Sequence, residues 1–207
     1  MERTRITVAR LGARATRSER HAFGRAAHRQ ARDRMHREKQ TKGRESRNGT
    51  VRSPERCYMI IADLGLVEGR RYPAGRRTQN LVGGASPIQA SHFAMGHVTL
   101  DPRGGQVPWH NQEQEEVYFI IEGTAEMCLG TERQVLRSGQ AVYIPSGVFH
   151  QVTNIGDTPM RLLYCYAPGG DVAHWRQELS GTLPRAGIDA PALPAGAHPQ
   201  YTEPPEH

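Results

Sequence analysis

Four residues in the middle of the chain carry side chains that bind metal ions, and their spacing allows them to meet. His110 and Gln112 are two positions apart, so on an extended strand both side chains point to one face. Glu116 and His150 can reach the same place from neighbouring strands if the sheet closes into a barrel. Two imidazoles and one carboxylate, with open positions left over, suit non-haem Fe(II), and also Mn, Ni or Zn. A divalent metal ion would also balance the charge of Glu116, which is costly when unpaired in an apolar pocket.

Tyr118 is the candidate catalytic residue beside these ligands. It lies two positions after Glu116, so it shares the facing of that carboxylate and can donate a hydrogen bond to a ligand or a substrate. Trp109 and Phe149 each precede one of the two histidines, and packing is the expected role of both aromatic rings.

The elements that must position these residues are short strands. Strand-like runs cover residues 93–100, 116–121, 125–129, 140–144, 150–153 and 161–166. Turns rich in Pro, Gly, Asn or Asp separate them, at residues 101–105, 122–123, 138–139, 145–147 and 154–157. Regular short strands with turn signals between them predict an all-β sandwich or barrel.

The ligand residues and the turn residues together form two spaced blocks. The first contains Gly104, His110, Gln112, Glu116 and Gly123, and the second contains Gly139, Pro145, Gly147, His150 and Asn154. They resemble the paired motifs of the cupin superfamily, G-x5-H-x-H-x3-4-E-x6-G and G-x5-P-x-G-x2-H-x3-N. The one fixed position that differs is Gln112, where the motif has histidine. The resemblance covers about residues 90–167 and implies an all-β cupin jelly-roll barrel over residues 57–167. It also implies a homodimer.

Gln112 leaves two interpretations open. Its amide oxygen can coordinate a metal ion, but it is neutral and a poorer donor than imidazole. Gln112 is therefore either a weak fourth ligand, or it leaves that position to water and hydrogen-bonds a bound substrate. We favour coordination because the motif spacing is kept. A barrel that has lost its metal and binds a small molecule passively is the remaining alternative.

The residues predict a metal-dependent protein that acts on a small organic molecule. The set of two histidines and a carboxylate favours a non-haem iron dioxygenase. The alternative enzyme is a non-redox isomerase or lyase, in which the metal polarises a carbonyl or hydroxyl while a side chain moves a proton. A non-catalytic metal- or ligand-binding cupin is the hypothesis from another class. A DNA-binding regulator with a cupin sensor would need residues 1–56 to fold, and they show no helix-turn-helix pattern.

Charge is distributed very unevenly along the chain. Residues 1–56 hold 17 Lys and Arg against 6 Asp and Glu, whereas residues 57–207 hold 10 against 15. The basic segment has few large apolar residues, so we expect it to be disordered. A translation start assigned too early, with Met59 as the true start, is one explanation. A basic tail, an organelle transit peptide and a nucleic-acid-binding arm are the others, and nucleic acid is not an expected partner.

The C-terminal part and the general composition complete the prediction. A helix is expected over residues 170–179, followed by a Pro-rich arm to residue 207 that wraps the barrel or stays loose, and His198 in it could reach the barrel mouth. No apolar stretch approaches the ~20 residues of a membrane helix. Cys128 and Cys165 lie in apolar runs, which indicates reduced, buried thiols and a cytoplasmic location.

Overall fold

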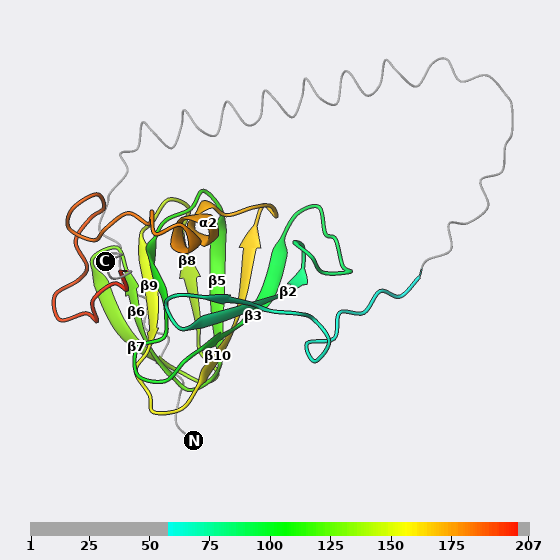
Figure 1. The fold of residues 1–207 in the computed structure, drawn as a ribbon, viewed down its shortest axis with the longest axis horizontal. Helices are drawn as coiled ribbons and strands as arrows, with labels where there is room; N and C mark the ends of the chain where they lie inside the picture. Colours follow the sequence, from blue (N-terminus) through cyan, green and yellow to red (C-terminus); the bar gives the residue numbers. More distant parts are fainter. Residues whose placement is uncertain (1–57, 203–207) are drawn as a thin grey trace, which may run out of the picture. The chain divides into compact units, whose positions relative to one another are not determined.

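The computed structural model describes residues 58–202, which form two antiparallel sheets and one short helix. Sheet A has the strand order β1-β2-β3-β10-β5-β8, and sheet B has the order β4-β9-β6-β7. The elements are β1 (Arg70–Tyr72), β2 (Arg76–Val82), β3 (Ala94–Leu100), β4 (Gln106–His110), β5 (Glu115–Glu122), β6 (Thr124–Leu129), β7 (Glu132–Arg137), β8 (Ala141–Ile144), β9 (His150–Asn154), β10 (Met160–Ala167) and α2 (Ala173–Leu179). The sheets face each other as a barrel, and α2 lies at one end of it (Figure 1). The predicted all-β barrel is confirmed.

The core lies between the two sheets because side chains alternate along each strand. On β5, Tyr118 and Ile120 are buried while Val117 and Phe119 between them face outward. The same alternation on the other strands fills the barrel with apolar residues, chiefly Ala94, Val98, Leu100, Val107, Ala125, Met127, Ile144, Val152, Met160 and Leu162. Near α2, tyrosines of the same core meet charged side chains, here Arg76 and Glu116.

The six predicted strands are all present, with ends that differ by at most one residue. The strands β1, β2, β4 and β7 were not predicted, and the reason is their polarity or proline content. The strand β2 reads RRTQNLV, yet its Arg76 and Thr78 are buried inside the barrel. The strand β7 is polar and mostly exposed at the edge of sheet B. The strand β4 contains Pro108, which is tolerated because β4 is the other edge of that sheet.

Two turn residues show why the motif positions matter to the barrel. Gly147 has a φ of 75°, a left-handed conformation that suits glycine, at the turn between β8 and β9. The side-chain amide of Asn154 donates hydrogen bonds to the backbone carbonyls of Leu100, Asp101 and Thr158 at 3.2, 3.0 and 2.8 Å. A single side chain at the end of β9 therefore ties together the connections after β3 and before β10.

The helix α2 starts later than expected, at Ala173 and not at residue 170. Asp171 lies outside the helix and makes an ion pair with Arg176 instead of capping it. No helix in residues 58–202 is long and apolar enough to cross a membrane.

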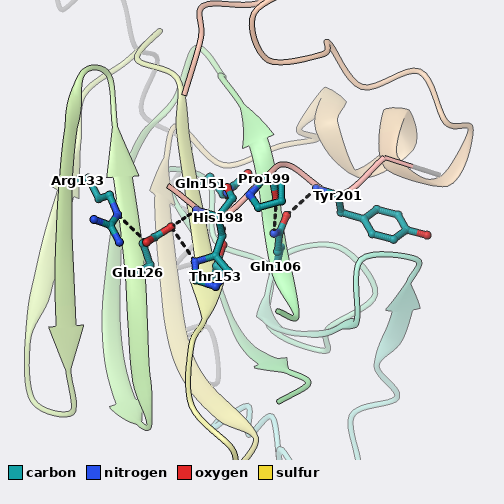
Figure 2. Close-up of polar contacts among 8 residues, drawn as sticks. All are labelled: Gln106, Glu126, Arg133, Gln151, Thr153, His198, Pro199 and Tyr201. Atoms are coloured by element: carbon teal, nitrogen blue, oxygen red, sulfur yellow. Dashed lines mark hydrogen bonds and ion pairs between the residues drawn. The ribbon is translucent and has the colours of Figure 1, made fainter. Parts of the chain in front are cut away.

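The segment after the helix, residues 181–202, is a C-terminal arm that lies on the outer face of sheet B. Of the two arrangements expected for it, the structure has the one that wraps the barrel. The indole Nε1 of Trp109 on β4 donates to the Pro191 carbonyl of the arm at 2.9 Å. Near the end of the arm, Gln106 on β4 donates to the carbonyl of Pro199 and accepts from the backbone N–H of Tyr201 (Figure 2).

The predictions for residues 1–56 fall outside the described residues. The described residues, 58–202, belong to one compact unit. The boundaries proposed for the barrel and the tail stay predictions.

Candidate metal centre

His110 and His150 meet because they are paired across sheet B. His110 ends β4 and His150 begins β9, and the two residues are direct antiparallel partners. Their ring centroids are 4.1 Å apart, and both side chains are fully buried. This pairing explains how two histidines that are far apart in sequence reach one point inside the barrel.

The backbone fixes the orientation of both imidazole rings. Nδ1 of His110 lies 2.6 Å from the Pro108 carbonyl oxygen, and Nδ1 of His150 lies 2.9 Å from that of Val148. A carbonyl oxygen can only accept, so the proton is on Nδ1 in each ring and the lone pair is on Nε2. Neither Nε2 has a hydrogen-bond partner among the described residues. Both rings therefore present an unused lone pair, as metal-binding histidines do.

Glu116 joins the histidines from the opposite sheet. It lies on β5 of sheet A, its side chain is buried, and its Oε2 is 3.5 Å from Nε2 of His150. The ligand atoms of His110, Glu116 and His150 all lie within 4.8 Å of one another. Burial lowers the pKa of His110 well below its usual value, which keeps its imidazole neutral and its lone pair available. The donor set fits a divalent metal ion.

Gln112 lies beside the cluster, but in a different backbone conformation from the strand that the sequence predicted. It lies beyond the end of β4 and not on a strand with His110. Its Nε2 donates to Oε2 of Glu116 at 3.2 Å, and its Oε1 is buried without a hydrogen-bond partner among the described residues. The strand geometry used to predict Gln112 was wrong, because Gln112 follows the end of β4. Its role as a metal ligand stays a prediction. The amide both holds Glu116 and presents a free acceptor.

Tyr118 shares the facing of Glu116, as predicted. It is buried, and its ring meets the ring of His150 edge-on at 5.9 Å between centroids. Burial raises the pKa of its phenol well above the usual value, and the charge of Glu116, which accepts its hydrogen bond, raises it further. Tyr118 is thus a hydrogen-bond donor toward the carboxylate and stays protonated.

His174 is the residue that sequence reasoning missed. It lies on α2, is buried, and its ring centroid is 3.7 Å from that of His110. Burial, with a smaller contribution from the charge of Arg76, lowers the pKa of His174 well below its usual value. No motif or spacing could have identified it, because only the folding of α2 over the barrel brings it to the cluster.

Other candidate side chains lie away from the cluster. Trp109 packs against Phe149 with 5.6 Å between ring centroids, which confirms packing as their role. His198 does not reach the barrel mouth: it contacts Glu126 on the outer face of sheet B, 2.6 Å from its backbone nitrogen to Oε1 (Figure 2). Cys128 is buried and Cys165 is half-buried, and both are free thiols.

An inner and an outer cavity share Trp175 of α2 in their lining. The inner one, beside the cluster, is about 10 Å³, roughly the room of one water molecule, and Arg76, Glu116, Tyr118 and His174 are among its lining residues. The outer one is about 650 Å³, and its lining includes Asp63, Arg70, Thr78 and Asn80. Trp175 of α2 lines both. The side chain of Trp175 therefore forms part of the wall of each cavity.

Comparison with known proteins identifies the barrel. The family model of the cupin domain matches residues 96–166. The chain is 35% identical over 68 residues to the uncharacterized protein MJ1618 of Methanocaldococcus jannaschii, which covers 32% of this chain and 54% of that protein. It is 34% identical over 84 residues to the dimethylsulfoniopropionate lyase DddQ of Ruegeria pomeroyi, covering 40% of this chain and 41% of that one. The chain spans about half the length of the first curated relatives that it matches.

Solved structures with a similar course of the chain have low overall scores. The polyketide cyclase RemF of Streptomyces resistomycificus has a TM-score of 0.48 at 21% identity, and the match covers 56% of this chain and 84% of that one. The TT1209 protein of Thermus thermophilus has a TM-score of 0.44 at 28% identity, covering 53% and 98%. The family-model match agrees with the two facing sheets and with both motif blocks: residues 96–166 of this chain form a cupin domain.

Proposed function

We propose that the cupin barrel binds a divalent metal ion through His110, Glu116 and His150 and acts on a small organic molecule. One observation carries the proposal: two buried imidazoles with backbone-fixed Nδ1 protons turn their free Nε2 atoms toward a buried carboxylate from the opposite sheet. Three such donors leave open coordination positions, which catalytic metal sites keep for water or substrate. Fe, Mn, Ni and Zn all match this donor set.

The surrounding side chains supply proton chemistry. When bound, a divalent metal ion polarises a carbonyl or hydroxyl oxygen of the substrate. Tyr118 holds a proton at its hydroxyl oxygen beside Glu116 and is our candidate catalytic donor. Gln112 orients Glu116 through its amide nitrogen, which leaves the amide oxygen for the metal ion or the substrate. These groups favour a lyase or isomerase, and the similarity to a dimethylsulfoniopropionate lyase supports that class.

A second chemistry is favoured by the donor set itself. Two histidines and one carboxylate with adjacent open positions are the ligands of non-haem iron oxygenases. The dioxygenase prediction therefore stays a candidate. Oxygen consumption by the Fe(II)-loaded protein on a panel of diols and diketones would support it, whereas turnover without O2 by the Mn or Zn form would support the lyase or isomerase.

The expected assembly and location belong to the same proposal. Val117, Phe119 and Ile121 on the outer face of β5 are about 40% exposed, each between 38% and 41%. An outward apolar row of this kind is compatible with a homodimer, and light scattering after size exclusion measures it. A cytoplasmic location stays a prediction.

The metal content of the protein tests the central proposal. We expect near-stoichiometric divalent metal in protein purified without chelator, and less than about a tenth of an ion per chain would contradict both enzyme versions. Replacing Glu116 by Ala should abolish metal binding. The matched control is Glu115→Ala, which removes the exposed carboxylate next to it on the opposite face of β5. Metal that survives Glu116→Ala would show that the ligand assignment is wrong.

A further inference from the structure

His174 is placed at the cluster by contacts that leave both of its ring nitrogens unused. Its side chain is buried, and neither Nδ1 nor Nε2 has a hydrogen-bond partner among the described residues. Buried polar atoms are nearly always paired, because an unpaired one loses its water without replacement. His174 lines the inner cavity together with Glu116 and Tyr118. Its nitrogens are therefore available to a molecule bound in that cavity.

The helix holds His174 there through a buried ion pair and ring packing. Nη2 of Arg76 on β2 lies 2.5 Å from Oε2 of Glu178 on α2, and both side chains are almost fully buried. Trp175 packs against Tyr164 and Tyr166 of β10, at 6.0 and 6.4 Å between ring centroids. These contacts anchor one face of α2 to sheet A. The location of His174 is thus built into the fold.

Arg76 offers a second unused donor in the same cavity. Its Nη2 is engaged by Glu178, but its buried Nε has no hydrogen-bond partner among the described residues, and the residue lines the cavity beside His174. A neutral imidazole carries one N–H whichever tautomer it adopts. His174 and Arg76 together therefore provide two N–H donors, which an oxyanion would accept.

The charges around the cavity favour an anion once a metal ion is present. Arg76 and Glu178 cancel each other, so Glu116 contributes the remaining negative charge among these three residues. A divalent cation at the cluster would leave one excess positive charge in a buried space, where an uncompensated charge is costly. A single carboxylate group would restore neutrality.

We propose that His174 and Arg76 bind the carboxylate of a small monoanionic substrate inside the barrel, next to the candidate metal ligands. This inference rests on the proposed function and names the class of its substrate. A carboxylate needs more room than the inner cavity of about 10 Å³ gives, so side chains that line this cavity must rearrange when the substrate binds. Trp175 lines both the inner and the outer cavity, so we propose its side chain as the one that shifts to make this room.

The test uses the full chain loaded with Co²⁺ and titrated with acetate, a minimal carboxylate. The visible absorption of Co²⁺ reports the metal site, and calorimetry gives the acetate Kd. His174→Phe keeps a ring over His110 but removes the N–H, so acetate binding should weaken about tenfold or more, as expected for one lost hydrogen bond to a charged group. His174→Gln restores an N–H and should recover part of the affinity. His97→Phe, at a buried histidine on β3, is the matched control and should leave the Kd unchanged.

The outcomes separate this inference from the proposed function. A wild-type protein that holds Co²⁺ but does not bind acetate overturns the inference alone, as does an unchanged Kd in His174→Phe with Co²⁺ still bound. A wild-type protein that holds no Co²⁺ overturns the metal proposal. In that case the role of His174 is still supported if the wild type binds acetate and His174→Phe does not. The role of His174 is overturned if His174→Phe binds acetate as the wild type does, or if the wild type does not bind acetate.

Discussion

The two histidines of the cluster are oriented by the same local contact, used twice. In each, Nδ1 meets the carbonyl oxygen of the residue two positions earlier, Pro108 for His110 and Val148 for His150. Because the carbonyl accepts the Nδ1 proton, each Nε2 faces the cluster as a lone pair. Gln112 has no equivalent constraint: its amide nitrogen is engaged with Glu116 and its oxygen is free. Gln112, the one residue that differs from the family motif, therefore has an amide oxygen whose partner is decided by what binds at the site.

Replacing Gln112 by His should strengthen metal binding. Imidazole is a better donor than an amide oxygen, so we expect the Kd for Zn²⁺ to fall by about tenfold or more, which corresponds to ~1.4 kcal/mol. Competition with a chromophoric chelator measures this Kd. Asn111→His adds an exposed imidazole one position away and serves as the control. Equal affinities for Gln112→His and the wild type would mean that position 112 does not face the ion.

At the scale of the elements, the C-terminal arm covers side chains on the outer face of sheet B and buries them. Glu126 on β6 points away from the core, yet its side chain is only 1% exposed. Its carboxylate accepts from the backbone N–H of His198 at 2.6 Å and from Nε of Arg133 at 2.6 Å (Figure 2). Gln151 on β9 donates to the carbonyl of His198. Polar side chains on the outer face of sheet B therefore bind the backbone of the arm through hydrogen bonds.

The stability contributed by Glu126 should depend on pH. Burial by itself raises the pKa of Glu126, but the hydrogen bonds from His198 and Arg133 outweigh it and bring that pKa below its usual 4.5. A lowered folded-state pKa means that the stabilisation is complete above about pH 4.5 and is lost as the pH falls through the folded value. Glu126→Gln should thus cost about 2 kcal/mol at pH 7 and progressively less toward pH 3.

Urea unfolding at several pH values measures this difference. Glu132→Gln, which changes an exposed carboxylate on the neighbouring strand β7, is the control and should alter stability little at any pH. A gap between the wild type and Glu126→Gln that stays constant from pH 7 to pH 3 would contradict the assigned role of the carboxylate.

For the whole molecule, the core and the charge excess belong to different parts of the chain. The buried apolar cluster draws on residues from Ala94 to Val172. The basic excess lies in residues 1–56, whereas residues 57–207 hold more acidic than basic side chains. The high calculated pI of about 9.6 is therefore not a property of the barrel and gives no reason to expect nucleic acid at the metal centre.

A chain that begins at Met59 should fold as the full chain does. We expect its Tm to differ by less than about 4 °C, a shift that corresponds to roughly 1 kcal/mol for a domain of this size. Differential scanning calorimetry of the two chains checks this value. Loss of soluble protein, or a much lower Tm, would show that residues 1–58 contribute to the fold and would contradict an early-start explanation.

The barrel and the three candidate ligands could be predicted from the amino-acid sequence. The turn glycines, Pro145 and Asn154 specify where strands end, and alternation along β5 fixes that Glu116 and Tyr118 share a face, because both signals are local. His110 and His150 were identified by spacing within their motif blocks. Polar or proline-containing strands such as β2 and β4 carried no such local signal and were missed.

The closure of the barrel and the lining of its cavity depend on tertiary packing and could not be predicted. Arg76 looks like a surface residue in its sequence context, and it is buried because Glu178, 102 positions later, neutralises it. His174 reaches His110 because α2 packs over the barrel mouth, and Gln112 meets Glu116 from a loop and not from a strand. Contacts between segments far apart in the chain form only when the sheets pack and bury these side chains. Periodicity and spacing are local features of the sequence, so they do not predict such contacts.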